Sequence, residues 1–137
     1  MARSTGVFAR VATDAEIDDV GVVSLEFEHG PVGVITGSYV SPRTYFLRLY
    51  GTEAVLEYEI DMAVWPHADR ADAATRLVLR TDEGAEQVPF EPRDPLAEEL
   101  DELAAAIRGE TTFETGPEEG LAALAVILAA LPEKARL

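Results

Sequence analysis

Apolar and polar residues alternate along most of the stretch from Val20 to Ile60, and this is the period of a strand with one buried and one exposed face. Turn signals interrupt the alternation at His29–Pro31, Ser41–Arg43 and Gly51–Glu53. Gly and Pro supply the backbone angles that tight turns need. The pattern therefore predicts successive hairpins, which together make an antiparallel meander.

The same reading of the whole chain predicts about seven strands. They are expected at Val7–Val11, Val20–Glu28, Val32–Val40, Tyr45–Tyr50, Val55–Ile60, Arg76–Thr81 and Glu86–Phe90. Met62–Trp65 either extends the fifth strand or begins another, and Pro66–Ala74 is polar and aperiodic, which indicates a surface loop.

Two helices are predicted after the strands. The first begins at Pro95, with Asp94 as its N-cap, and ends at a left-handed Gly109. Thr115–Glu118 has the spacing of a capping box and opens the second helix. The apolar stripe of the first helix is Leu96, Leu100, Leu103 and Ile107, and that of the second is Leu121, Leu124, Ile127, Leu128 and Leu131. Alanines widen the second stripe, so we expect that helix to be buried on much of its surface.

Strands that precede helices indicate the α+β class with segregated helices. We therefore expect a single domain over residues 1–137, in which a largely antiparallel meander sheet carries the two C-terminal helices on one face. The covered face includes Val23, Leu25 and Phe27, which share one strand parity. The other, open face is expected to include Ser24, Glu26, Glu28, Thr36, Ser38, Arg48, Glu57 and Glu59.

The chain is strongly acidic, with a formal net charge of −15, and it repels phosphate backbones, so nucleic acid is not an expected partner. Cysteine is absent, which excludes disulfides and thiolate chemistry. No apolar run is long enough to span a membrane, and a cytoplasmic protein is the default expectation. The acidity fits either a salt-loving source or an ordinary acidic surface; stability that is equal in dilute buffer and molar salt would count against the first.

Four residues are candidates for facing a substrate. Trp65 and His67 lie in the expected loop, where they could stack on and hydrogen-bond to a polyol, although a rim tryptophan beside an exposed histidine is the simpler interpretation. Arg43 and Tyr45 follow Ser41-Pro42; the arginine could bind a carboxylate or hydroxyl groups, or form an ordinary surface ion pair. His29, before Gly30-Pro31, is expected to be an exposed turn residue.

No self-sufficient catalytic set is visible. The adjacent carboxylate pairs Asp18-Asp19, Glu98-Glu99 and Glu118-Glu119 point in different directions on a strand or helix and cannot easily share a metal or proton. No spacing of His, Asp and Glu matches a metal site, and no serine has a nucleophile-elbow context. We therefore expect no catalytic, metal or cofactor-binding residues in this chain.

The order of motifs resembles the C-terminal domain of the glucose-fructose oxidoreductase / inositol dehydrogenase / MocA (Gfo/Idh/MocA) family of NAD(P)-dependent oxidoreductases. The matching elements are Phe27-x-x-Gly30-x-x-Gly33-x-Ile35, Ser41-Pro42-Arg43, Leu49-Tyr50-Gly51-Thr52, Ala106-Ile107-Arg108-Gly109 and Thr115-Gly116-Pro117-Glu118. The resemblance implies a substrate-facing wall and an oligomer contact through the open sheet face. It also implies that an N-terminal Rossmann domain supplies NAD or NADP.

The family's other motifs are missing. Gly30, Gly33 and Gly37 have the wrong spacing for a dinucleotide-binding loop, and Lys134, the one lysine, lies in the wrong context for the family's catalytic lysine. The resemblance therefore implies a domain, not catalytic by itself, of an enzyme that acts on a sugar, polyol or related hydroxy compound. The alternatives are a stand-alone protein that self-associates or binds a small ligand, and, more weakly, an acidic nucleic-acid mimic.

Overall fold

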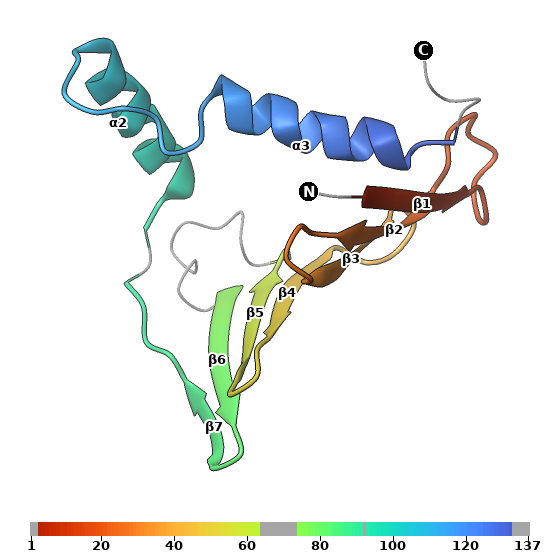
Figure 1. Cartoon of the computed structure of the whole chain (residues 1–137), viewed down its shortest axis with the longest axis horizontal. Coiled ribbons are helices and arrows are strands. Elements are labelled where there is room, and N and C mark those ends of the chain that lie inside the picture. Colours follow the sequence, from red (N-terminus) through yellow and green to blue (C-terminus); the bar gives the residue numbers. More distant parts are fainter. Residues whose placement is uncertain (1–2, 64–73, 92, 133–137) are drawn as a thin grey trace. The chain divides into compact units, whose positions relative to one another are not determined.

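The computed structural model describes residues 3–63, 74–91 and 93–132 of the chain. In these residues, seven strands and two helices follow one another in the order β1 to β7, α2, α3 (Figure 1). They form two compact units, one made of Met1–Ser41 with Phe113–Leu137 and the other of Pro42–Thr112. The predicted α+β class, with antiparallel strands before helices, is confirmed.

The first unit contains a three-stranded antiparallel sheet of β1 (Arg3–Ala9), β2 (Val20–Glu26) and β3 (Val32–Ser38), in that order. The register places Gly6 opposite Val23, and Val23 opposite Ile35. Because side chains alternate across a strand, Val23 and Leu25 share one face, and Ser24, Glu26, Thr36 and Ser38 share the other, as the sequence predicts.

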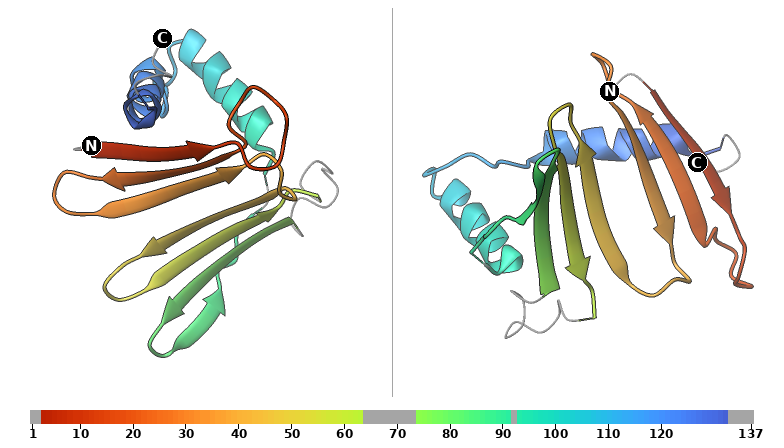
Figure 2. Two further views of the ribbon diagram at one scale, coloured as in Figure 1. Left: turned by 90° about the vertical axis from the view of Figure 1, so that its right-hand side faces the viewer. Right: turned by 90° about the horizontal axis from the view of Figure 1, so that it is seen from below.

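Helix α3 (Pro117–Ala130) packs against β1, the edge strand of this sheet (Figure 2). The Ser4 hydroxyl donates a hydrogen bond to the carbonyl oxygen of Val126, at 3.0 Å. Gly6 lets the helix approach, because a Cβ atom at this position would lie only 2.6 Å from the Ala130 carbonyl oxygen and would also overlap the Phe8 ring. The α3 side of the sheet is therefore the face that carries Gly6, Val23 and Leu25.

The second unit contains a four-stranded antiparallel sheet of β4 (Thr44–Tyr50), β5 (Val55–Asp61), β6 (Thr75–Thr81) and β7 (Gly84–Gln87). Helix α2 (Pro95–Ile107) follows, and Asp94 caps it as predicted: the carboxylate accepts from the amides of Leu96 and Ala97, at 3.0 and 3.2 Å. Gly109, at φ 75°, takes the left-handed conformation predicted at the end of this helix.

The prediction of one seven-stranded meander is wrong, because the strands form separate sheets of three and four. The division falls at Ser41-Pro42. Pro42 has no amide hydrogen to give to a ladder, the Ser41 hydroxyl donates to the Ser38 hydroxyl at 2.8 Å, and the Tyr39 amide donates to the Asp19 carbonyl at 2.8 Å. The end of β3 is thus bonded to the β1–β2 connection.

Several boundaries also differ from the prediction. β1 begins at Arg3 instead of Val7, and β7 covers Gly84–Gln87 instead of Glu86–Phe90. The first strand ends at Ala9 instead of Val11, because the amides that follow Arg10 donate to a side chain, as described below. Helix α3 takes Gly116 as its N-cap, one residue after the expected Thr115, and the Glu119 carboxylate accepts from the Gly116 amide at 2.8 Å.

Few residues in the described part of the chain are buried: Ala74, Val78 and Ala130 among the apolar ones, and Asp19 among the polar ones. The expectation that α3 is buried on much of its surface is wrong, since Leu121 and Ile127 remain more than half exposed. No residue of α2 is buried either, whereas the sequence predicts that its apolar stripe is covered by a sheet face.

Candidate functional site

One face of the β4–β7 sheet carries a cluster of alternating charges that we call the ionic ladder: Arg48, Glu57, Glu59, Arg76 and Arg80. The register creates it, because Arg48 lies opposite Glu57 and Glu59 opposite Arg76 on neighbouring strands. Opposite charges that face each other across strands stabilise that pairing. The sequence placed Arg48, Glu57 and Glu59 on one face, and the register confirms it.

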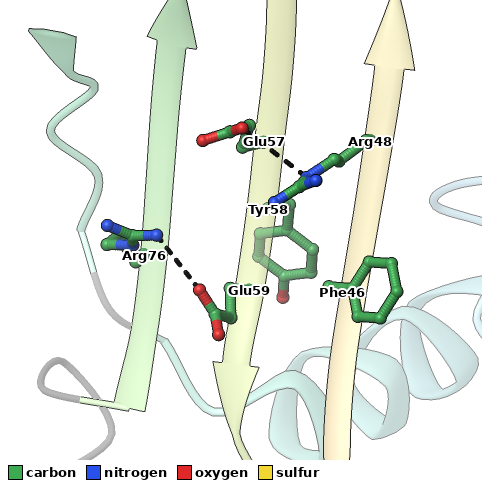
Figure 3. A pocket seen from close by; sticks show the side chains of 6 residues that line it. All are labelled: Phe46, Arg48, Glu57, Tyr58, Glu59 and Arg76. Carbon is green, nitrogen blue, oxygen red and sulfur yellow. Dashed lines mark hydrogen bonds and ion pairs between the residues drawn. The ribbon is translucent and has the colours of Figure 1, made fainter. Parts of the chain in front are cut away.

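Glu57 is the centre of the ladder; Figure 3 shows its pair with Arg48 and, beside it, the pair of Glu59 with Arg76. The Glu57 carboxylate lies 3.5 Å from Arg48 Nε and 3.0 Å from Arg80 Nε, and its side chain is only 15% exposed. Glu59 pairs with Arg76 at 3.1 Å, in an exposed position. The Arg48 guanidinium carbon also lies 6.0 Å from the centre of the Phe46 ring, within the range of a cation–π contact.

A shallow pocket of about 130 Å³ lies on the ladder, lined by Phe46, Arg48, Glu57, Tyr58, Glu59 and Arg76 (Figure 3). Drug-sized ligands occupy pockets of roughly 300–1,000 Å³. The pocket is therefore smaller than those that hold drug-sized ligands, and its charged groups are already paired with one another.

The opposite face of this sheet is apolar and carries Tyr45, one of the four residues expected to face a substrate. The Tyr45 and Tyr58 rings meet edge to face, with centroids 6.0 Å apart, and Tyr45 remains 49% exposed. Arg43, another of the four, lies exposed directly before β4. The structure thus places Arg43 and Tyr45 two residues apart at the start of one strand. Trp65 and His67 lie outside the described residues.

The predicted role of His29 as an exposed turn residue is confirmed. It adopts φ 72° in the connection between β2 and β3, and Gly30 follows at φ 105°. A non-glycine residue in the left-handed region is uncommon, and histidine is among the residues found there more often than most. The turn therefore accounts for His29 without a catalytic role.

Asp19 is the residue that the sequence reasoning missed. It is only 2% exposed and lies directly before β2. Its carboxylate accepts hydrogen bonds from the backbone amides of Val11, Ala12 and Thr13 at 2.8, 2.9 and 2.8 Å, and from the Thr13 hydroxyl at 3.1 Å. Successive amides that converge on one anion form a cradle, here occupied by the chain's own side chain.

The cradle changes the acidity of Asp19. Donation from the Ala12 amide, aided by Val11 and Thr13, lowers the pKa of the carboxyl from 3.8 to about 2, although burial acts in the opposite direction. Hydrogen bonds to the charged form favour that form. Asp19 therefore holds the β1–β2 connection as a carboxylate. The acidic run Asp14–Asp19 is a weak signal for this role, because nothing in it distinguishes Asp19 from Asp18.

Among the described residues, no three His, Asp or Glu side chains are placed to hold a metal ion. Within the same residues, neither helix has the length and apolar character that crossing a bilayer requires. Gly33 and Gly37 lie within β3, and Gly30 in the turn before it.

No family model and no curated protein matches the chain. Solved structures do. A Desulfitobacterium hafniense protein, provisionally named an NADPH-dependent oxidoreductase, is 33% identical over 94% of this chain, with a TM-score of 0.86. A Thermotoga maritima protein, provisionally named an oxidoreductase, and UDP-N-acetylglucosamine 3-dehydrogenase from Acidithiobacillus ferrooxidans match at 16% and 19% identity, over 93% and 94% of this chain, both with a TM-score of 0.68.

The match covers only part of each of these proteins: 38% of the Desulfitobacterium chain, 37% of the Thermotoga chain and 40% of the Acidithiobacillus chain. The Thermotoga and Acidithiobacillus matches, at 16% and 19% identity, show only the shared fold. The Desulfitobacterium match adds a sequence identity of 33% to the shared fold. The expected relationship to oxidoreductases is thereby confirmed. This chain has the fold of a part of solved oxidoreductases and spans about two fifths of their length.

Proposed function

We propose that this chain is the substrate-facing and oligomerisation domain of an NAD(P)-dependent oxidoreductase of the Gfo/Idh/MocA family. The enzyme acts on a sugar, polyol or related hydroxy compound. An N-terminal Rossmann domain binds NAD or NADP and carries the groups for hydride and proton transfer. The chain described here binds no cofactor and is not catalytic by itself.

The observation that carries this proposal is the match to the Desulfitobacterium protein. At 33% identity and a TM-score of 0.86, nearly all of this chain corresponds to 38% of that protein. A whole enzyme of this kind therefore contains more than this fold. The name of the Acidithiobacillus enzyme, a dehydrogenase of a nucleotide sugar, supports the class of substrate.

The exposed apolar surface is the second support. Both helices and the apolar face of the β4–β7 sheet leave large side chains open to solvent, including Leu100, Ile127 and Leu49. A folded domain of this length buries about two thirds of the surface that its unfolded chain exposes, and large apolar patches mark interaction sites. Such surfaces suit a domain that is completed by another one.

Arg43, Tyr45, Trp65 and His67 are the residues that we propose to face the substrate. Tyr45 offers a half-exposed ring and hydroxyl, and Arg43 an exposed guanidinium two residues away. Among the described residues, no hydrogen bond or ion pair engages the Arg43 guanidinium, in contrast to the ladder arginines. Such a group remains able to bind a hydroxyl or an anionic group of a ligand.

For the oligomer contact we propose the open sheet face. In the first unit this face carries Val7, Val22, Val32 and Val34, all exposed, on the side away from α3. In the second unit, the ionic ladder offers paired charges of both signs. A two-fold contact needs a self-complementary surface, and alternating Arg and Glu residues provide one.

A hybrid enzyme tests the assignment: the Desulfitobacterium protein with its matched region replaced by this chain. We expect one cooperative unfolding transition, whose midpoint temperature NADPH raises. We also expect hydride transfer between the cofactor and at least one member of a panel of sugars and polyols. The isolated chain should show no NADPH binding in calorimetry up to about 1 mM. Separate transitions, of which only the nucleotide-binding part responds to NADPH, would contradict the proposal, as would micromolar NADPH affinity of the isolated chain.

The oligomer contact has its own test. Light scattering of the hybrid should give a dimer or larger assembly. Val34→Arg, which places a charge in the open face, should reduce it to a smaller species. Val11→Arg, at an equally exposed position outside the strands, serves as the control. An assembly that is unchanged by Val34→Arg contradicts the open-face contact but leaves the oxidoreductase assignment standing.

A further inference from the structure

The hydrogen bonds at the two ends of β2 show which of its residues bond to which neighbouring strand. Just before β2, the Asp19 carbonyl accepts from the Tyr39 amide at 2.8 Å. Just after β2, the Phe27 amide donates to the Pro31 carbonyl at 2.9 Å. Successive residues of an antiparallel strand direct their backbone groups to opposite sides. The odd-numbered residues of β2 therefore bond to β3, and the even-numbered residues bond to β1.

The register then identifies the backbone groups at the free edge of β1. Thr5 and Val7 lie opposite even-numbered residues of β2, so their amides and carbonyls bond to β2. The backbone groups of Ser4, Gly6 and Phe8 are directed to the other side, where the described sheet has no strand. An extended strand is the structure that satisfies such a row of alternating donors and acceptors.

Helix α3 limits what can pair with this edge. It packs against β1, and the Ala130 carbonyl oxygen would lie only 2.6 Å from a Cβ atom on Gly6. The C-terminal end of α3 therefore stands directly over the centre of β1. Neighbouring strands lie about 4.8 Å apart, whereas packed helices need roughly 8–10 Å between their axes. The edge has room for a strand, but not for a strand that carries a helix at the same place.

A second copy of β1 does not meet this limit. Two copies that pair antiparallel over all seven residues place Gly6 opposite Gly6 of the other copy, with the Cα atoms about 5.5 Å apart. The ends of both α3 helices would then stand on one face of the joined sheet, at about the same separation. Each of these ends carries a partial negative charge, so the two would also repel each other. The occupant of the edge is therefore a different segment.

We infer that the free edge of β1 receives one strand from the part of the longer enzyme that lies outside the matched region. This inference rests on the proposed function, and it names a backbone contact that joins the two parts. The Desulfitobacterium chain has more than half of its length outside the match, which is ample for a strand. On the open face, the added side chains lie beside Thr5 and Val7, the latter 71% exposed, so β-branched residues suit this strand.

Amide hydrogen exchange, resolved to single residues by mass spectrometry, tests the inference by comparing the isolated chain with the hybrid enzyme. We expect exchange at Gly6 and Phe8 to be at least about tenfold slower in the hybrid, because these amides gain an acceptor there. Thr5 and Val7 are internal controls, since their amides bond to β2 in both proteins. Equal slowing at all four residues would indicate general stabilisation and would contradict pairing at the edge.

A proline at the edge gives a second test. Ser4→Pro removes an amide that is directed to the free edge, and Ser4→Ala is the control, because both substitutions lose the hydroxyl bond to Val126. Proline is tolerated in an edge strand where its nitrogen faces solvent, so the two variants of the isolated chain should have similar melting temperatures. In the hybrid, Ser4→Pro should melt at least about 2 °C below Ser4→Ala. The same difference in both proteins would count against an added strand.

The outcomes separate the two proposals. A hybrid that binds NADPH and unfolds in one transition, while Gly6 and Phe8 exchange as fast as in the isolated chain, overturns the strand pairing and leaves the proposed function intact. A hybrid that unfolds in independent transitions contradicts the proposed function and the strand pairing with it. Protection of the same amides in the isolated chain, growing with protein concentration, would show a second copy at the edge and overturn the assigned occupant.

Discussion

The two units hold their strands by different means. In the first, one carboxylate, Asp19, is saturated by three backbone amides, and α3 approaches β1 at a glycine. In the second, Glu57 holds two arginine side chains across three strands. Asp19 is almost fully buried, whereas the arginines around Glu57 are about half exposed.

The difference teaches where substitutions should be costly. Backbone donors cannot move away, so loss of their acceptor leaves buried polar groups without partners. Arginine side chains can turn to water when their partner is removed, and exposed ion pairs contribute little. The first unit should therefore be sensitive to single substitutions, and the second tolerant.

The largest effect is expected at Asp19. Asp19→Ala removes the acceptor of three backbone amides, each of which costs about 1 kcal/mol or more when it is left without a partner, and should lower the melting temperature by roughly 10 °C or more. Asp18→Ala, next to it and exposed, is the control and should have a much smaller effect. Differential scanning calorimetry on the isolated chain measures both. Equal losses for the two substitutions would show that the cradle has no special role.

The dependence of stability on pH in the acid range should also reflect Asp19. The folded pKa of Asp19, about 2, lies below its ordinary value of 3.8, so its stabilising effect is complete above about pH 4 and is lost as the pH falls toward 2. The difference in melting temperature between the wild type and Asp19→Asn should be constant at neutral pH and shrink below pH 4. A difference that stays constant down to pH 2 would contradict this linkage.

The next largest loss of stability is expected at Gly6, where α3 packs closely against β1. Gly6→Val forces a side chain against the Phe8 ring and the Ala130 carbonyl, and we expect a loss of about 2 kcal/mol in the free energy of unfolding, measured with urea. Gly37→Val is the matched control, since it lies on β3 with nothing within 4 Å of the added carbon. Valine favours strands, so the control should be neutral or slightly stabilising.

The smallest effect is expected at the ionic ladder. Glu57→Gln keeps the shape but removes the charge between Arg48 and Arg80, and it should cost about 1 kcal/mol or less, falling further in molar salt. Glu59→Gln, which removes a single exposed pair, should cost less still. A loss at Glu57 as large as that at Asp19 would remove the contrast between the two units.

The strand and helix elements could be predicted from the sequence because their signals are local. The alternation of polar and apolar residues located most ends of β2 to β6 to within one or two residues, and Asp94-Pro95 located the start of α2. Face assignments followed as well, because strand parity alone places Val23 with Leu25 and Glu57 with Glu59.

Other features depend on contacts that composition does not encode. The division into two sheets arises where Tyr39 bonds to Asp19, a contact between residues 20 positions apart. The Asp19 cradle exists only because the β1–β2 connection directs the amides of Val11, Ala12 and Thr13 toward the Asp19 carboxylate. The acidic residues beside Asp19 make it indistinguishable from them in the sequence. The exposure of α2 could not be foreseen either, since an apolar stripe predicts burial without naming the surface that provides it.

Strand β1 has one partner, and its other edge carries backbone groups with no strand beside them in the described sheet. Such an edge can template the addition of a foreign strand, and long edge strands are recognised starting points of aggregation. β1 has seven residues, with Val7 exposed, and Arg3 is its single charge. Preparations of the isolated chain are therefore expected to form fibrils at high concentration unless this edge is protected, for example by a proline or a further charge.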